Sequence, residues 1–397
     1  MSKSKITDIV SSLFLIIFGW LVVAPLALLI PRNKRLFVTV SRNKVLFSDN
    51  TKYLFIYLKK SRQDWLSYHI SDVRNKKNQC RDILYYPSVK AIWVLLRASV
   101  IAVDYSGWFT NFKYHLSIKA KKIQLWHGVG SKKIEMATDQ FTKSRLKKFR
   151  ILYGLLRGQL IKYHLFASTS DYYTEHLYKG AFFYKHIKNF GQPRNDALYR
   201  LPNELDLIGS DEKIINLLVE EKRKNNAKVV LYSPTYRSKI EETLINYESL
   251  DIYCKNNNIL FVVKPHSLSS LSELNGYSNV LYYQKAKDIY PLFSLADLMI
   301  TDYSSIYLDY ILLNKPIIFY LADYEAYHLN ENNLRADYLD ITPGTKCYSQ
   351  NELEEVLVAT LFKGRDDYSE QRQEIINLSY EFQDDKASQR IIDFLTL

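Results

Sequence analysis

The chain has 397 residues, with 54 Lys and Arg against 42 Asp and Glu, and its formal net charge is +12. This length is too great for one compact core and predicts two or three domains. The excess of positive charge predicts anionic partners, such as phosphorylated substrates or acidic lipids. The three cysteines lie far apart without a CxxC pair and imply neither a disulfide framework nor a zinc site.

The N-terminal segment contains no charged residue from Ile9 to Ile30, a length that can just cross a bilayer core. A signal peptide is disfavoured because no small-residue cleavage site follows the apolar run. A core helix is disfavoured by Pro25 and by the lack of a polar face. We expect residues 1–32 to form a membrane-anchoring or membrane-associated helix. The basic cluster at 32–35 favours catalytic domains on the cytoplasmic side of the cell membrane, and Pro25 leaves open a kinked helix that does not span.

The first half of the chain alternates apolar strands with helical stretches, which predicts a parallel, doubly wound sheet in a domain over residues 33–200. We expect an amphipathic helix over 50–59 and strands at the following ranges: 36–40, 98–103, 123–126 and 164–169. A basic amphipathic segment over 142–164 either lies on an anionic membrane or forms a solvated helix over the sheet.

A turn-rich stretch over 191–211 predicts a domain junction, followed by a second α/β domain over 201–365 and a helical C-terminal segment over 366–397. In this domain three buried strands run directly into polar loops: SPTYR at 233–237, KPHS at 264–267 and TDYSS at 301–305. Ligands of open α/β sheets bind beyond the carboxyl ends of the strands. These loops therefore predict one ligand site.

The motif LWHGVGSKK at 125–133 places His127 at a strand end, where an imidazole can act as a general base near neutral pH. Gly128 and Gly130 allow a ligand to approach the backbone closely. Taken alone, this motif is a weak signal, because a lone histidine is more often structural than catalytic.

The loops of the second half carry groups that suit a nucleoside diphosphate. Thr235 and Arg237 offer donors for phosphate oxygens, and Lys264 with His266 offers two cations. Ser304 and Ser305 precede a predicted helix, whose N-terminus attracts phosphate, and Asp309 follows one turn later, where it suits ribose hydroxyls. Taken separately, SPTYR is also explained by an ordinary turn and the serine pair by a plain helix cap, whereas KPH favours a functional role. No Walker loop, GxGxxG or HExxH motif is present.

The order of these motifs resembles that of the CDP-glycerol glycerophosphotransferase family, the teichoic acid primases and polymerases. The matching pieces are SDN at 48–50, LWHGVGSKK at 125–133, GQPRND at 191–196, YSPTYR at 232–237, KPHS at 264–267, ITDYSSIYLDY at 300–310 and NKPIIFY at 314–320. Two positions depart from the family pattern. WHGVG stands where WHGT is usual, and Ser267 stands where Pro is usual, which leaves the identity of the polyol open.

The resemblance implies a GT-B architecture, in which two Rossmann-like domains face each other across a cleft. It implies His127 and His266 as catalytic residues. The contacts to the CDP donor would come from Trp126, Gly128, Val129, Gly130, Arg194, Pro234, Thr235, Lys264, Pro265, Ser304, Ser305 and Asp309, beside Arg237. Family polymerases tend to carry a large extra N-terminal region, so the length of this chain is more typical of a primase or a capsule transferase.

The expected reaction is attack of an acceptor hydroxyl on the phosphorus that carries the polyol, with release of CMP. The expected partners are CDP-glycerol or CDP-ribitol, a lipid-linked or polymer acceptor and an anionic membrane, but no nucleic acid. No DxD-like pair is evident, and Mg²⁺ is left open as a cofactor. The rival interpretations are a sugar-nucleotide glycosyltransferase of the same architecture and a non-catalytic membrane scaffold.

Overall fold

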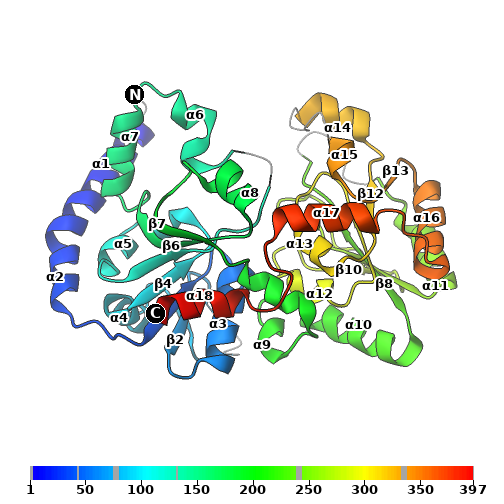
Figure 1. Ribbon diagram of the computed structural model, residues 1–397, viewed down its shortest axis with the longest axis horizontal. Coiled ribbons are helices and arrows are strands. Elements are labelled where there is room, and N and C mark those ends of the chain that lie inside the picture. Colours follow the sequence, from blue (N-terminus) through cyan, green and yellow to red (C-terminus); the bar gives the residue numbers. More distant parts are fainter. Residues whose placement is uncertain are drawn as a thin grey trace. The chain divides into compact units, whose positions relative to one another are not determined.

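The structure is a computed structural model that describes residues 3–42, 44–74, 80–130, 133–237, 244–331 and 338–396. The chain forms two compact α/β units, and Figure 1 labels their helices and strands. Unit 1 comprises Met1–Asp196 and Asp384–Leu397, and unit 2 comprises Ala197–Gln383. The predicted fold class of two Rossmann-like units with an N-terminal apolar helix is confirmed. The chain passes between units after Asp196 rather than after residue 200, and only its last residues return to unit 1.

Unit 1 is built on a seven-stranded sheet in the order β3-β2-β1-β4-β5-β6-β7, and every pairing is parallel. Its strands are β1 Leu36–Val40, β2 Leu66–Ser71, β3 Ile83–Tyr85, β4 Val100–Val103, β5 Lys121–Gln124, β6 Lys162–Ser168 and β7 Phe183–Asn189. Its helices are α1 Lys3–Phe18, α2 Ala24–Leu29, α3 Asp49–Ser61, α4 Val89–Arg97, α5 Lys113–Leu116, α6 Asp139–Thr142, α7 Lys147–Leu156, α8 Asp171–Tyr173 and α18 Ala387–Thr396.

Unit 2 has a six-stranded parallel sheet in the order β10-β9-β8-β11-β12-β13. Its strands are β8 Lys228–Ser233, β9 Ile259–Val263, β10 Val280–Tyr282, β11 Leu298–Thr301, β12 Ile317–Tyr320 and β13 Thr345–Cys347. Its helices are α9 Glu204–Leu207, α10 Glu212–Asn225, α11 Tyr247–Asn256, α12 Tyr290–Phe293, α13 Tyr307–Tyr310, α14 Tyr324–Glu331, α15 Tyr338–Ile341, α16 Gln350–Lys363 and α17 Ser369–Ser379.

Both sheets have the doubly wound strand order, in which successive strands are added first on one side of the first strand and then on its other side. The reversal lies between β1 and β4 in unit 1 and between β8 and β11 in unit 2. Loops at the carboxyl ends of these two strand pairs diverge and leave room for a ligand. Each unit therefore has its own predicted ligand-binding edge.

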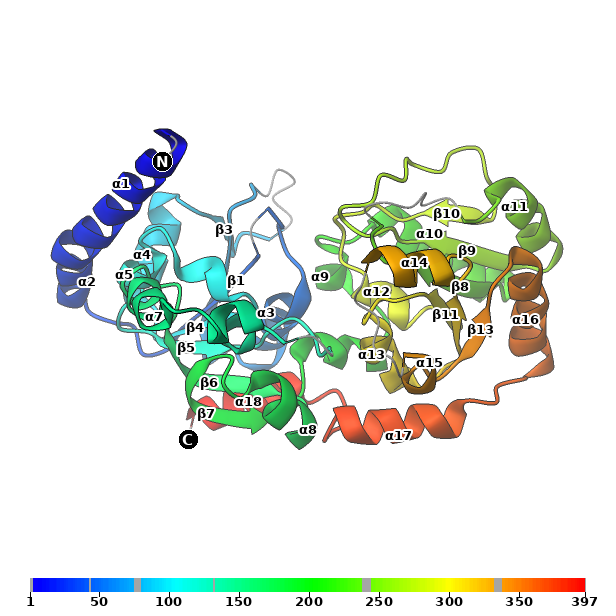
Figure 2. The same ribbon diagram turned by 90° about the horizontal axis from the view of Figure 1, so that it is seen from above.

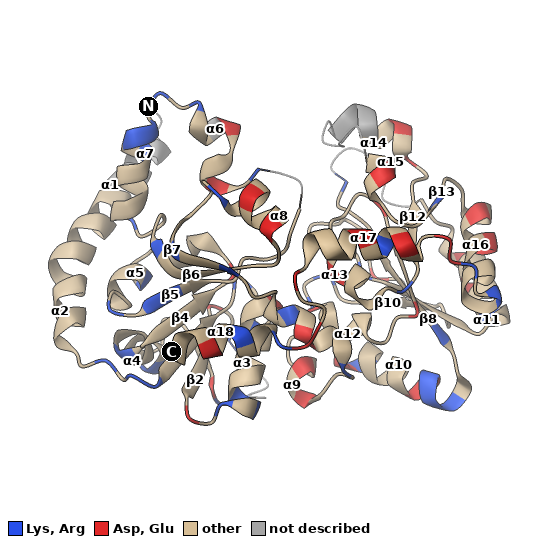
Figure 3. Cartoon of the chain, viewed as in Figure 1, with Lys and Arg blue, Asp and Glu red and all other residues tan. Residues whose placement is uncertain are grey.

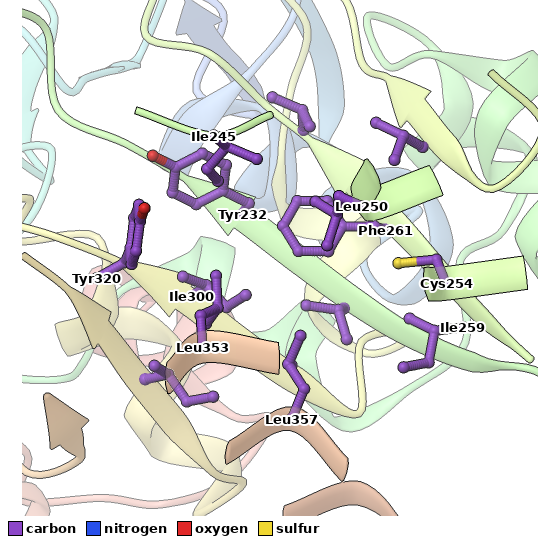
Figure 4. Packing of buried hydrophobic residues seen from close by; sticks show 14 of the residues in the cluster. Tyr232, Ile245, Leu250, Cys254, Ile259, Phe261, Ile300, Tyr320, Leu353 and Leu357 are labelled. Atoms are coloured by element: carbon purple, nitrogen blue, oxygen red, sulfur yellow. The ribbon is translucent and has the colours of Figure 1, made fainter. Parts of the chain in front are cut away.

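The central strands are continuous apolar runs because helices cover both faces of a parallel sheet. All five residues of β1 and all five of β9 are buried. Figure 4 shows part of the unit 2 core, where Tyr232 and Phe261 from neighbouring strands pack with Leu250 of α11 and Leu353 of α16. Helices that present apolar side chains at helical spacing complete this core.

The N-terminal helix is continuous but changes its winding. A π-helical turn, Gly19–Val23, joins α1 to α2, and the N–H of Ala24 bonds to the carbonyl of Gly19. The proline ring at Pro25 cannot donate a backbone hydrogen bond and crowds the preceding turn, so a widened turn relieves both effects. The stretch Ser11–Leu29 is long and apolar enough to cross a membrane by length and composition. In Figure 3, α2 carries no charged residue.

The C-terminal helix α18 belongs to unit 1, where it packs against α3 (Figure 1). The Asp196 carboxylate accepts hydrogen bonds from the backbone N–H groups of Ala387 and Ser388, both at 2.9 Å. This carboxylate satisfies two of the free donors at the first turn of α18. The GQPRND motif at 191–196 therefore also holds the end of the chain in place.

Two sequence expectations about local structure need correction. The amphipathic segment 142–164 is helical only over 147–156 in α7, and its last residues start β6. Four strands were not predicted: β2, β3, β7 and β13. The helix over 50–59 and the other predicted strands are present, within a few residues of the expected ends.

Candidate functional site

The reversal point of unit 1 carries a cluster of polar side chains from four loops. Arg42 follows β1, Asp49 begins α3, Asp104 follows β4, and His127 follows β5. The fourth loop, after β7, contributes Arg194. The structure thus brings together His127 and Arg194, which the sequence singled out, with three charged residues that it did not.

His127 is held in one orientation and one neutral tautomer. Its Nδ1–H donates to the carbonyl of Asp104 at 2.9 Å, because a carbonyl can only accept. In the neutral ring the proton on Nδ1 leaves Nε2 as the basic nitrogen. The ring stacks on Trp126 with centroids 4.0 Å apart. Burial, reinforced by the positive charge of Arg42, lowers the pKa of His127 to about 4, so the ring is neutral at physiological pH.

Asp49 is shared by two arginines. Its Oδ2 lies 2.6 Å from Arg42 Nη2, and its Oδ1 lies 2.8 Å from Arg194 Nη1. Burial alone would raise the pKa of Asp49, but the two guanidinium groups outweigh burial and bring it to about 2. Asn50 adds a second link, because its side chain donates to the carbonyl of Trp126 and accepts from the backbone N–H of Arg194. The loops after β5 and β7 are therefore fixed to the start of α3.

Asp104 has a different electrostatic state. Its side chain is buried, accepts from the Thr51 hydroxyl at 3.1 Å, and lies 3.8 Å from Arg42 Nε. Burial and the nearby charge of Asp49 raise the pKa of Asp104 to about 7. The main-chain carbonyl of Asp104 orients His127, while its carboxyl group lies among the buried charges of Arg42 and Asp49.

The remaining residues of the first motif shape the loop. Trp126 and Val129 are buried, and Trp126 adopts a positive φ of 53°. Gly128 has φ +127°, and a Cβ there would lie 2.8 Å from Arg194 Nη2. A Cβ on Gly130 would meet nothing within 4 Å. Gly128 is therefore required by both conformation and space, whereas Gly130 lines open space.

In unit 2 the reversal point is organised by Arg237. Its guanidinium contacts Asp302 Oδ2 at 2.7 Å and Asp323 Oδ2 at 2.6 Å, with all three side chains buried. Asp302 also accepts from the backbone N–H of Thr235 at 2.8 Å. These contacts tie the loop after β8 to the loops after β11 and β12. The sequence predicted that Arg237 contacts phosphate, and in the structure its guanidinium lies between the Asp302 and Asp323 carboxylates.

The KPH loop after β9 has two basic side chains, of which Lys264 is buried and His266 is exposed. Lys264 Nζ donates to the carbonyls of Lys285 at 2.6 Å and Pro265 at 3.1 Å, and burial lowers the pKa of Lys264 to about 8. His266 is exposed, and its Nδ1 accepts from the backbone N–H of Leu268 at 3.2 Å. Its ring lies 5.9 Å from that of Tyr236, in the loop after β8. The loops after β8 and β9 are thus neighbours, as predicted.

The TDYSS loop is placed as predicted, directly between β11 and α13. Ser304 Oγ accepts from the N–H of Ile306, and Ser305 is exposed. Asp309 lies inside α13, is buried, and accepts from the Tyr290 hydroxyl at 2.9 Å. Pro234 and Thr235 are half-buried beside this loop, and the Thr235 Oγ1 makes no hydrogen bond among the described residues. Ser305 therefore exposes its side chain, the Thr235 hydroxyl is buried, and the Asp309 carboxylate is hydrogen-bonded within the core.

The sequence reading missed five charged residues of the two sites: Arg42, Asp49, Asp104, Asp302 and Asp323. Asp49 and Asp302 lie in the motifs SDN and TDYSS, which the sequence analysis noted, but no function was assigned to these two aspartates. Within the described ranges, no group of three or more His, Cys, Asp and Glu side chains is arranged to hold a metal ion.

Comparison with known proteins connects this site to an enzyme family. The model of the CDP-Glycerol:Poly(glycerophosphate) glycerophosphotransferase family matches residues 22–397. A teichoic acid poly(glycerol phosphate) polymerase of Bacillus spizizenii is 28% identical over 362 residues, which cover 86% of this chain and 87% of the relative. A teichoic acid glycerol-phosphate primase of Bacillus subtilis is 29% identical and covers 67% and 66% of the two chains. Because a polymerase matches over most of its length, chain length does not separate the primase and polymerase types, contrary to our expectation.

The fold has a solved counterpart. The wall teichoic acid polymerase TagF, in a variant form, superposes with a TM-score of 0.74 at 21% sequence identity, covering 98% of this chain and 95% of that chain. At this identity the likeness supports the two-unit fold, whereas the chemistry rests on the family match and on the residues described above.

Proposed function

Because the chain belongs to the CDP-glycerol:poly(glycerophosphate) glycerophosphotransferase family, we propose that it transfers glycerol phosphate from CDP-glycerol to a hydroxyl group of a membrane-held acceptor. The observation that carries the chemistry is the fixed tautomer of His127, whose Nδ1–H is committed to the Asp104 carbonyl. The acceptor oxygen attacks the phosphorus bearing glycerol, its proton passes to Nε2 of His127, and the bond to the bridging oxygen breaks. The products are CMP and a phosphodiester.

The low pKa of His127 keeps the ring unprotonated, but it also makes the ring a weak base. A neutral ring can accept a proton at any physiological pH. A base with a pKa near 4 is weak, but a phosphate group bound beside Arg42 and Arg194 would offset the two positive charges that lower the pKa of His127. We therefore propose that binding of a phosphate group in unit 1 strengthens the base.

Unit 2 is assigned to the donor. Its polar groups at the strand ends are the exposed His266 ring, the Ser305 and Thr235 hydroxyls and the buried ammonium group of Lys264, beside the Ser304 hydroxyl and the backbone of Pro234 and Pro265. Phosphoryl transfer requires mainly positioning and stabilisation of negative charge, which such groups supply. Arg237 and Asp309 hold the loops from behind.

Unit 1 is assigned to the membrane, and we propose that its N-terminal helix lies on the bilayer instead of spanning it. The indole N–H of Trp20 donates to the carbonyl of Leu156 at 2.9 Å, and Gly19 packs directly on His115. A helix attached in this way to α5 and α7 cannot be surrounded by lipid. Its outer side remains apolar and exposed, as does α7, through the residues Phe14, Ile17, Leu21, Leu26, Leu29, Leu146, Phe149 and Leu152.

Purified protein would be incubated with anionic vesicles that carry a lipid-linked acceptor and, in separate reactions, with CDP-glycerol, CDP-ribitol or a UDP-sugar. We expect acceptor-dependent CMP release from CDP-glycerol and a phosphodiester product in the mass spectrum. The His127→Ala variant should turn over at least about a hundredfold more slowly. If CDP-ribitol is preferred, the transferred group is ribitol phosphate and not glycerol phosphate. Release of UDP would support a glycosyltransferase, and absence of nucleotide release would support a scaffold.

Membrane binding has its own test. Leu152→Glu on α7 places a charge on the apolar surface and should reduce co-sedimentation with anionic vesicles by about tenfold or more. Ile252→Glu is the matched control because Ile252 is similarly exposed, at 59% against 55%, but lies in unit 2. Equal loss in both variants would remove the membrane assignment of α7.

A further inference from the structure

A cavity of about 400 Å³ in unit 1 has no part in the mechanism proposed above. It lies between the turn Glu135–Ala137, helix α6 and helix α7. Figure 2 shows α7 beside α5, on the part of unit 1 that also carries the N-terminal helix. The volume is that of a small ligand or of the head of a larger one.

The lining of the cavity is amphipathic. Phe141, Phe149 and Tyr153 supply aromatic faces, while Glu135, Arg150 and Gln159 supply hydrogen-bonding groups. The Arg150 guanidinium lies 5.3 Å from the centre of the Phe141 ring, which places a positive charge over the aromatic wall. An acyl chain needs only apolar walls. Aromatic faces, an arginine, the Glu135 carboxylate and the Gln159 amide together fit a hydroxylated group that carries a phosphate.

The cavity shares its wall with the loop that carries His127. The Ser106 hydroxyl donates to Glu135 Oε1 at 2.7 Å, and Asp104, two residues earlier, accepts from His127. On the other side, the N–H of Met136 bonds to the carbonyl of Ala181, and the adjacent Phe182 ring lies 4.9 Å from Trp126. The same two loops therefore position both the proposed base and the cavity.

The cavity also adjoins the proposed membrane surface. Helix α7 lines it with Phe149 and Tyr153, while Leu152, Leu155 and Leu156 of the same helix are exposed. Lys143, Arg145, Lys147 and Lys148 surround α6 and the start of α7 and would face anionic head groups. A lipid-held ligand could reach this cavity without leaving the bilayer.

We infer that this cavity binds the head group of the membrane-held acceptor, a hydroxylated group joined through phosphate to a lipid. Arg150 pairs with the phosphate, Glu135 and Gln159 hydrogen-bond to hydroxyls, and the aromatic rings cover the apolar face of the head group. The inference rests on the proposed transferase function, and it adds the site at which the acceptor is held.

The test is a pocket-filling variant, Gln159→Trp, in the full-length protein. Gln159 is exposed at the mouth of the cavity, and its main-chain N–H keeps its bond to Gly154, so the fold should tolerate the larger side chain. We expect the KM for a vesicle-held acceptor to rise about tenfold or more, while the KM for CDP-glycerol and vesicle co-sedimentation remain unchanged. Ile252→Trp is the control, because it adds the same ring at an exposed position of unit 2, away from both the cavity and α7.

A soluble acceptor analogue with a short alkyl chain separates head from tail. If the cavity holds the head group, Gln159→Trp raises the KM of this analogue as well. An unchanged KM for the analogue would place the lipid tail in the cavity and overturn the inference, as would an unchanged KM for both acceptors. Wild-type protein that releases no CMP from CDP-glycerol would refute the proposed function, which is a separate result.

Discussion

Replacement of Gly128 by alanine tests whether the positions of the proposed base, His127, and of Arg194 depend on each other. The new Cβ would lie 2.8 Å from Arg194 Nη2 at a φ of +127°. A long side chain could normally move aside, but Arg194 is only 4% exposed and its Nη1 is 2.8 Å from Asp49. A residue held in such a backbone region costs about 1–3 kcal/mol. Relief of the strain therefore requires movement of the histidine loop or of the arginine.

The expected size of the effect follows from that strain. If 1–3 kcal/mol is lost from the productive arrangement, kcat/KM should fall about fivefold to 150-fold. The same strain should lower the Tm of unit 1 by about 2–12 °C if it is retained in the folded state. Acceptor-dependent CMP release and differential scanning calorimetry would measure the two effects.

Gly130→Ala is the matched control, two residues later in the same loop. Its Cβ would meet nothing within 4 Å, so activity and Tm should stay close to those of the wild type. Equal activity of the two variants would refute the reasoning, because it would mean that neither the backbone conformation at Gly128 nor the position of Arg194 matters to the reaction.

Three further predictions use other contacts. In the pH profile of kcat/KM, the apparent pKa on the acidic side should lie below the ordinary histidine value of about 6.5, because the pKa of His127 is lowered to about 4. Arg42→Gln should raise this apparent pKa, because it removes a positive charge near His127. An apparent pKa at or above 6.5 in the wild type would contradict the prediction. Arg237→Gln should lower the free energy of unfolding of unit 2 by about 3–5 kcal/mol in urea titrations, because it leaves two buried carboxylates unpaired. Asp196→Ala should increase hydrogen exchange in α18 and cost about 0.5–2 kcal/mol, and protection equal to the wild type would show that packing alone holds this helix.

The fold was largely predictable where strands are apolar throughout. β1, β9 and β12 are buried along their whole length and read as continuous apolar runs. The strand β7, with the sequence FYKHIKN, was missed because it lies at the edge of the sheet and all of its residues are half-buried or exposed. Sheet edges tolerate charged side chains, so the pattern of an edge strand resembles that of a loop.

The strand β2 was missed for another reason. Its His69 is fully buried and hydrogen-bonds to Thr39 at 2.8 Å and to Ser41 at 2.6 Å. Burial lowers the pKa of His69 to about 3, so the ring is a neutral, satisfied core residue. A sequence shows the polarity of such a residue but not its partners, which lie some thirty positions away and in another strand.

The same limit applies to the site. Strand ends located His127, Thr235, Lys264 and the serine pair, because the polar loops follow recognisable strands. Nothing local could reveal that Arg237 is committed to Asp302 and Asp323, which lie in loops after two other strands. Pairing of charges depends on the order of strands in the sheet, and that order is a tertiary property.

These pairings also indicate where the positive charge of the chain is available. Arg42, Arg194 and Arg237 all face buried carboxylates, so they contribute field and geometry to their sites but little uncompensated charge. By contrast, residues 143–157 hold six Lys and Arg and no acidic residue, which is half the size of the net charge of +12. In the proposed function, attraction to an anionic surface and recognition of a nucleotide therefore depend on different residues. Added salt, or a substitution in α7, should weaken attraction to the surface and leave nucleotide recognition unchanged, because exposed charges are screened far more strongly than buried ones.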